Sequence, residues 1–182
     1  MTTEDHWTQP SDWCPNPKWW HADTTDATEH EVTNLVAAFV SALQPDLVVE
    51  TGSNTGQTSQ AIGRALRINS HGVLDTIESD ADLHQAAIAM CVGLPVNCIH
   101  GSSLDYIPAG QIGFAWFDSD VHIRHLEVER FLPHFATGAI FGVHDTGPQH
   151  PVKNYLQPLV DQGRIIPITL RTPRGVTFAQ VL

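Results

Sequence analysis

The sequence has little positive charge. Its 182 residues include nine Lys and Arg against twenty Asp and Glu, which gives a formal net charge of −11. Binding to nucleic acid needs clustered Lys and Arg that neutralise phosphates, and anionic membrane surfaces attract the same positive charge. We therefore expect neither nucleic acid nor a membrane as a partner.

Long hydrophobic runs and a cysteine framework are also missing. No apolar run approaches the roughly 20 residues that cross a bilayer. The N-terminus carries Glu4, Asp5 and His6, where a signal peptide has basic and apolar regions. The three cysteines, an odd number without metal-type spacing, are Cys14, Cys91 and Cys98. These features predict reduced thiols in a cytoplasmic protein.

The beginning of the chain lacks regular structure, since Pro10, Pro15 and Pro17 interrupt it. Four of the five tryptophans fall there: Trp7, Trp13, Trp19 and Trp20. We predict an irregular Trp-rich arm over residues 1–27 and one domain over residues 28–182. The aromatic side chains either pack the arm onto the domain or make it a lid over a substrate pocket.

Apolar runs and helix-spaced segments alternate through the rest of the chain. Strands are predicted at residues 47–50, 72–78, 96–100, 112–117, 139–143, 165–170 and 176–182. Helices are predicted at about 28–43, 58–68, 83–91, 126–135 and 152–162. This alternation favours an α/β fold: a Rossmann-like, doubly wound, seven-stranded and mostly parallel sheet, with helices on both faces and a C-terminal antiparallel β-hairpin.

A tight turn follows the first predicted strand. Gly52, Asn54 and Gly56 place conformationally permissive residues at alternate positions. Such a turn lets a ligand approach the backbone at the carboxyl end of a parallel strand. The predicted helix caps are Thr28 with Glu31, then Thr58 or Ser59, then Ser79 or Asp80.

Polar groups end all five of the first predicted strands. They are Glu50, Glu78, Ser102 with Ser103, Asp118 with Asp120, and His144 with Asp145. The carboxyl ends of parallel strands share one edge of a sheet, so we expect these side chains to converge on one site. Glu78 follows Gly56 at the distance from which an acidic residue binds ribose hydroxyls in nucleotide-binding folds. It equally suits the start of a helix.

These motifs resemble those of class I S-adenosylmethionine-dependent methyltransferases. Glu50-x-Gly52-x-Asn54-x-Gly56 looks like their first motif, and Glu78 matches their ribose-binding acid. Residues 118–120 and 144–146 look most like small bacterial O-methyltransferases related to the catechol and macrolide or sugar O-methyltransferases. The resemblance covers about residues 28–182.

The resemblance implies S-adenosylmethionine as cofactor. The residues it places at the cofactor are Glu50, Gly52, Ser53, Asn54, Gly56, Thr58, Ser59, Glu78, Ser79, Ser102 and Asp118. Glu50 would lie near the cofactor's ammonium group, Glu78 would bind the ribose, and Ser102 would lie by the adenine. A carboxylate suits a diol and an ammonium group but suits a diphosphate badly, and the turn has no Lys for a phosphate loop.

The resemblance also implies a candidate divalent metal site, with Mg²⁺ as an example, at Asp118, His144 and Asp145. His144 departs from the pattern, since an acidic residue is common there and Mg²⁺ prefers oxygen ligands. His144 is therefore either a ligand to a softer metal or a general base, and His122 ranks second as a base. The predicted catalytic residues are His144, Asp118 and His122. For both histidines, the alternative is a purely structural role in capping or loop hydrogen bonds.

The favoured function is S-adenosylmethionine-dependent O-methylation of a small molecule. The alternatives are an NAD-dependent oxidoreductase and a non-catalytic cofactor-binding domain of the same fold. No stretch builds a separate substrate domain, so the site is either open or completed by a second subunit in a homodimer.

Overall fold

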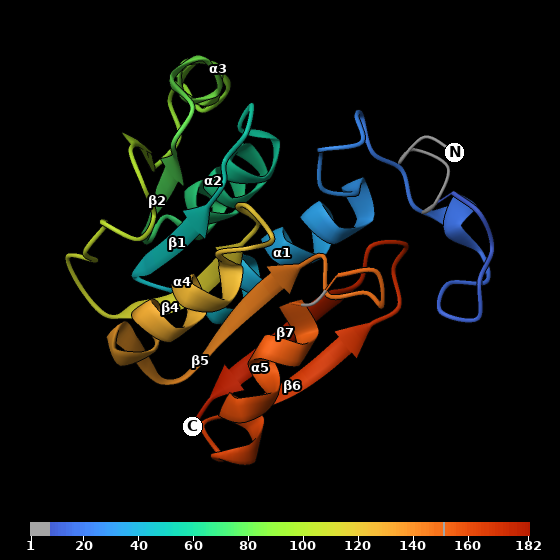
Figure 1. Cartoon of the computed structure of the whole chain (residues 1–182). Helices are drawn as coiled ribbons and strands as arrows, with labels where there is room; N and C mark the ends of the chain where they lie inside the picture. The colour runs from blue at the N-terminus through green and yellow to red at the C-terminus, as the bar shows by residue number, and fades with distance from the viewer. Residues whose placement is uncertain (1–7, 151) are drawn as a thin grey trace.

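The chain alternates strands and helices along one sheet, which Figure 1 shows in cartoon form. The computed structural model describes residues 8–150 and 152–182. Within them the strands are β1 (Leu47–Thr51), β2 (Val73–Glu78), β3 (Val96–His100), β4 (Ile112–Phe117), β5 (Phe135–His144), β6 (Ile165–Leu170) and β7 (Val176–Val181). The helices are α1 (His30–Leu43), α2 (Gln57–Asn69), α3 (Ala81–Met90), α4 (Arg124–Phe131) and α5 (Val152–Asp161), with 3₁₀ turns η2 (Pro17–Trp19) and η3 (Leu132–His134).

The strand order places a crevice at the middle of the sheet. The order across the described residues is β3-β2-β1-β4-β5-β7-β6. Strands β1 to β5 are parallel, and β7 pairs antiparallel with both β5 and β6. The chain runs outward from β1 to β3 and then returns to β4 beside β1, so this pair is the switch point where open α/β sheets bind ligands. The predicted Rossmann-like fold, with its terminal hairpin, is confirmed.

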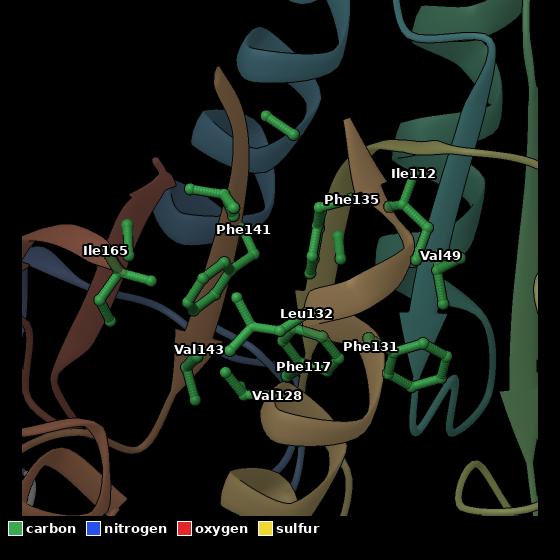
Figure 2. Close-up of a cluster of buried hydrophobic side chains, with 14 of the residues drawn as sticks. Val49, Ile112, Phe117, Val128, Phe131, Leu132, Phe135, Phe141, Val143 and Ile165 are labelled. Atoms are coloured by element: carbon green, nitrogen blue, oxygen red, sulfur yellow. The ribbon is translucent and has the colours of Figure 1, made fainter. Parts of the chain in front are cut away.

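Helices cover both faces of the sheet. One buried cluster joins the strands to α4 and α5, and Figure 2 shows Val128, Phe131 and Leu132 lying beside the strand residues Phe117 and Val143. A second cluster joins the opposite face to the inward stripes of α1 and α2. The hydrophobic effect at these two interfaces fixes the sheet between its helices.

The turn after β1 has the backbone that its residue types predict. Gly52 and Asn54 have φ values of +78° and +49°, and Gly56 has φ of +90°. A Cβ on Gly52 would lie 2.5 Å from the backbone oxygen of Asp118, so only glycine lets the turn pass this close to the end of β4. The turn and the end of β4 are therefore packed directly against each other.

The predicted caps are only partly correct. Asp80 caps α3 and accepts hydrogen bonds from the backbone N–H groups of Asp82 and Leu83, as predicted. Helix α2 instead begins after Gly56 without a side-chain cap. Thr58 and Ser59, predicted as caps, lie inside α2 and are buried.

The predicted capping box at the start of α1 is also wrong. The N-cap position belongs to Glu29, which makes no side-chain capping bond. Thr28 donates its hydroxyl to Asp118 instead, and Glu31 bonds to the backbone and ring of His21. Both predicted capping side chains are therefore committed to tertiary contacts.

The predicted boundary between α4 and β5 is also wrong. The helix ends at Phe131 and continues as the η3 turn, where Pro133 stands in the first turn. Strand β5 then begins at Phe135, four residues before the predicted start. Gly138 has φ of +80°, and the β4–β5 register shifts between Ile112 and Phe114, so an irregular first half of β5 hid its start.

The described part of the N-terminal arm is packed onto the domain. The indole N–H of Trp13 donates to the backbone oxygen of Thr172 at 2.9 Å, and the Arg171 guanidinium lies 5.8 Å from the centre of the Trp13 ring. Trp20 packs against the second core cluster. The arm lies beside the loop between β6 and β7 in Figure 1. Trp7 lies outside the described residues.

None of the helices in the described ranges combines the length and apolar character needed to span a membrane.

Gly142 in β5 provides a test of the core. A Cβ there would lie 2.6 Å from the Trp116 ring, whereas one on the exposed Gly110 would meet no atom within 4 Å. We expect Gly142→Ala to lower the free energy of unfolding by about 1–3 kcal/mol through overpacking. Gly110→Ala should change it by less than about 0.5 kcal/mol. Urea unfolding measures both, and equal midpoints would contradict the described packing.

Candidate active site

A cavity of about 270 Å³ lies at the carboxyl ends of the central strands. Its walls come from the turns after β1, β2, β3 and β4, and include Gly52, Glu78, Ser79, Ser102, Ser103 and Asp118. A second, smaller cavity adjoins the β1 turn and is lined by Ser53, Asn54, Thr58, Asp118 and the segment Asp26 to Thr28. Residues far apart in the sequence thus meet at the switch point, as the strand ends predicted.

Glu78 is held rigidly at the wall of the larger cavity. One of its carboxylate oxygens accepts the backbone N–H of Asn54 at 2.8 Å, and the other accepts the backbone N–H of Asp80 at 2.9 Å. Each carboxylate oxygen can accept two hydrogen bonds, so both retain capacity for a ligand. This arrangement suits two neighbouring hydroxyl groups.

Ser53 is a polar group without a partner. Its hydroxyl oxygen is buried and makes no hydrogen bond among the described residues. A buried hydroxyl without a partner is costly, and such groups are commonly satisfied by a ligand or by water. Ser53 also lines the smaller cavity. The cavities, Glu78 and Ser53 together fit a polar cofactor of the kind predicted from the sequence.

Glu50 does not line either cavity. Its carboxyl group is fully buried and accepts hydrogen bonds from the hydroxyls of Ser59 and, at 2.6 Å, Thr76. Burial, together with the negative charges of Asp118 and Glu78, raises the pKa of Glu50 to about 7, although the hydrogen bonds from the two hydroxyls oppose this shift. The geometry favours a role in joining β1, β2 and α2 over the predicted contact with an ammonium group.

Gly56, another predicted cofactor residue, faces a neighbouring helix. A Cβ there would lie 2.9 Å from the Cα of Ala87. Gly56 therefore lets the start of α2 lie close against α3. Of the predicted cofactor residues, Glu50, Gly56 and Ser59 are the ones that line neither cavity.

Glu127 of α4 organises the floor of the larger cavity, and sequence reasoning missed it. Its fully buried carboxyl group accepts hydrogen bonds from Thr51 at 2.9 Å, Ser119 at 2.7 Å and Ser103. These three hydroxyls belong to the ends of β1, β4 and β3. Burial raises the pKa of Glu127, while the hydrogen bonds from the three hydroxyls oppose that shift.

A sequence signal for Glu127 did exist. The buried residues of α4 recur at helical spacing, and they are Arg124, Glu127, Val128 and Phe131. Two charged residues therefore stand on an otherwise apolar, inward stripe. Charged side chains on such a stripe need buried partners.

Asp118, His144 and Asp145, the predicted metal ligands, are brought together. One potential ligand atom from each lies within 4.8 Å of the others, which is close enough for all three to contact one ion. The Asp145 backbone has φ of +56°, an uncommon conformation for a residue with a side chain. Its carboxyl group is 1% exposed.

Two arginines already contact this acidic group. Arg124 of α4 donates to Asp145 at 2.6 Å and lies 3.0 Å from Asp118. Arg174, from the loop before β7, makes two hydrogen bonds to Asp145, at 2.6 and 2.9 Å. Burial alone would raise the pKa of both carboxyl groups, but His144 and Arg124 beside them hold both pKa values below their ordinary range.

His144 lies between two carboxylates and is inaccessible to solvent. Its Nδ1 is 3.0 Å from Asp118, and its Nε2 is 2.6 Å from Glu29, which sequence reasoning also missed. Burial alone would lower the pKa of His144, but Asp118, Asp145 and Glu29 raise it to about 10. The ring is therefore held as an imidazolium at neutral pH.

The surroundings of the predicted catalytic residues argue against a role in accepting a proton from a substrate. A protonated His144 with both nitrogens engaged cannot accept a proton from a substrate. Asp118 accepts hydrogen bonds from Thr28 and His144 and contacts Arg124. His122 is exposed and lines neither cavity. The geometry instead gives His144 and Asp118 a role in fixing the architecture of the site.

Comparison with known proteins shows the fold of this chain. No family model matches the sequence, and no curated protein matches it. Several solved structures, in contrast, are similar to this chain. The O-methyltransferase TomG from Streptomyces achromogenes, involved in tomaymycin synthesis and crystallised with S-adenosylmethionine (SAM), is 20% identical, with 85% of this chain and 81% of that chain covered and a TM-score of 0.72.

Two further structures are similar. An O-methyltransferase from Bacillus cereus, in complex with S-adenosylhomocysteine (SAH), is 15% identical over 87% of this chain and 84% of its own, with a TM-score of 0.77. The SAH-bound methyltransferase PaMTH1 from Podospora anserina is 15% identical over 98% of this chain and 87% of its own, also at 0.77. The chain has the fold of these methyltransferases. In this methyltransferase fold, the cavity described above lies at the switch point of the sheet.

The contact between Glu29 and His144 predicts a pH dependence of stability. The folded pKa of His144, about 10, lies above the ordinary value of 6.5. Protonation of His144 therefore stabilises the fold fully below pH 6.5, and this contribution is lost as the pH rises towards 10. In Glu29→Gln the imidazolium loses one carboxylate and the folded pKa of His144 falls, so we expect the loss to be smaller in total and to be complete at a lower pH.

Urea unfolding at a series of pH values between 6 and 10 measures this difference. The matched control is Glu31→Gln, which removes the exposed contact to His21. The control should follow the wild-type profile. Superimposable profiles for Glu29→Gln and the wild type would contradict the described ion pair.

Proposed function

We propose that the protein is a SAM-dependent methyltransferase that transfers a methyl group to an oxygen atom of a small molecule. The observation that carries the proposal is Glu78, a carboxylate fixed by two backbone N–H groups at the wall of a 270 Å³ cavity at the switch point. The similar structures that contain SAM or SAH support the same cofactor.

The cofactor would lie across both cavities. Glu78 would accept hydrogen bonds from the ribose hydroxyls, and Ser79 and Ser102 would lie beside the base. The turn containing Ser53 and Asn54 would hold the amino acid portion, where the Ser53 hydroxyl has no partner among the described residues. Neither cavity is lined by Lys or Arg, which makes a diphosphate cofactor such as NAD a poor electrostatic fit.

The chain itself would act mainly by positioning. When bound, SAM supplies a methyl group on a positively charged sulfur. The acidic lining would favour that positive charge, and the tight turn at Gly52, packed against the end of β4, would hold the cofactor in this part of the cavity. Holding two reactants in line is by itself a large contribution to rate.

A group other than His144 would have to accept the proton that the acceptor hydroxyl loses. Asp26 and Asp120 are exposed carboxylates that face the two cavities, and among the described residues neither forms an ion pair. A carboxylate is a weak base, so it accepts a proton most readily from an acidic hydroxyl. We therefore propose an acceptor with a phenolic, enolic or carboxylic hydroxyl. The unpaired cysteines support a cytoplasmic location for the reaction.

The cofactor assignment predicts the effect of one substitution. Glu78→Gln removes a charged acceptor that would bind two hydroxyl groups, so we expect SAH to bind about 10- to 100-fold more weakly. The matched control is Glu129→Gln, an exposed residue of α4 outside both cavities. Isothermal titration calorimetry measures the affinities of the wild type and the two variants.

Two results would refute the proposal at different levels. If the wild type fails to bind SAM or SAH, the cofactor assignment is wrong. If it binds SAH but transfers no labelled methyl group to any of a broad panel of phenols, enols and carboxylic acids, the site is a non-catalytic cofactor-binding domain.

A further inference from the structure

We propose that the Arg124 guanidinium takes the place of a divalent cation between Asp118 and Asp145, so that this centre works without a metal. The sequence suggested Asp118, His144 and Asp145 as metal ligands, and their side chains lie close enough together to hold a metal ion. The side chains around them argue otherwise. The inference concerns metal binding alone and stands whether or not the protein transfers methyl groups.

Arg124 bridges the two carboxylates that a metal would bridge. One of its terminal nitrogens lies 2.6 Å from Asp145, and the other lies 3.0 Å from Asp118. The guanidinium is further held by the backbone oxygens of Ser119 and His144, the latter at 2.8 Å. The Arg124 side chain is 4% exposed, so the whole group is enclosed. A cation between the carboxylates would have to displace it.

The fixed charges are already close to balance. The acidic groups are the buried Glu29 and Asp145 and the largely enclosed Asp118, and the guanidinium groups of Arg124 and Arg174 lie against the two aspartates. Three negative charges thus face two permanent positive charges. Beside both arginines, a divalent cation would turn this enclosed centre net positive, and uncompensated charge in the protein interior is costly, so a cation could enter only by expelling Arg124.

The third predicted ligand has no free atom to offer. The Nδ1 of His144 lies 3.0 Å from Asp118, and its Nε2 lies 2.6 Å from Glu29. A metal-bound imidazole needs one nitrogen lone pair for the metal. His144 would have to break one of these contacts inside a fully buried site. Of the three predicted ligands this leaves the carboxylates of Asp118 and Asp145, and arginine already contacts both.

The same contacts tie a wall of the smaller cavity to the strand ends. Thr28 donates to Asp118 at 2.6 Å, and Glu29 contacts His144. Arg174 donates to the backbone oxygens of Thr25 and Ala27, at 3.2 and 3.1 Å. The charge cluster thus fixes residues 25–29 in position. In this protein, the cluster organises the cavity wall instead of holding a metal for a substrate.

The first test is direct metal binding by the full-length wild type. Titration with MnCl₂, followed by calorimetry and by the electron paramagnetic resonance signal of free Mn²⁺, should show no binding tighter than about 1 mM. EDTA should leave the midpoint of thermal unfolding unchanged. Binding of one Mn²⁺ per chain at micromolar concentration, abolished by Asp145→Asn, would overturn the proposal.

The second test removes the guanidinium. Arg124→Gln leaves the two carboxylates facing each other, so its thermal midpoint should fall by about 10 °C. MnCl₂ should raise the midpoint of this variant while leaving the wild type unchanged. The matched control, Arg130→Gln, alters an exposed arginine of the same helix and should have the wild-type midpoint with or without Mn²⁺.

Two outcomes of the second test would also overturn the proposal. One is an Arg124→Gln midpoint equal to that of Arg130→Gln, because the guanidinium would then not be compensating buried charge. The other is an equal response of the wild type and Arg124→Gln to MnCl₂. If Arg124→Gln does not fold, the wild-type titration alone decides between a metal site and an arginine-filled one.

Discussion

Three carboxylates that are largely shielded from water cannot share one region of a protein unless positive charge lies among them. Glu29, Asp118 and Asp145 meet this constraint through His144, Arg124 and Arg174. The partners come from the segment before α1, the ends of β4 and β5, helix α4 and the loop before β7. One electrostatic requirement therefore fixes the relative positions of five segments around the switch point, and the cavities depend on those positions.

A further buried carboxyl group, that of Glu127, connects helix α4 to the same strand ends. Glu127 gathers hydroxyls from the ends of β1, β3 and β4, while Arg124 on the same face of α4 reaches β4 and β5. Helix α4 thereby holds four strand ends in register with polar contacts, in addition to its apolar packing (Figure 2). Glu78 lies apart from both groups and keeps hydrogen-bonding capacity for a ligand. Glu127 and Arg124 thus hold the protein segments around the cavity together, whereas Glu78 is available to bind a ligand.

The sequence predicted the fold well because its signals are local. Apolar runs located the strands. Gly52 and Asn54 have left-handed backbone conformations, which both residue types tolerate. The start of β5 was missed because its first half is irregular around Gly138. The contact between His144 and Glu29 was missed because the two residues lie 115 positions apart along the chain. Strand-end chemistry can be predicted from spacing, but which charges neutralise one another depends on tertiary packing.

The central claim is a SAM-binding site whose acidic strand ends are neutralised by arginine. A crystal structure of the protein grown with SAH and MnCl₂, with anomalous data collected at the manganese edge, tests both halves at once. The account predicts SAH with its ribose on Glu78, the Arg124 guanidinium between Asp118 and Asp145, and no anomalous peak there. An empty cavity at saturating SAH, or a manganese peak between the two carboxylates with Arg124 displaced, would contradict it.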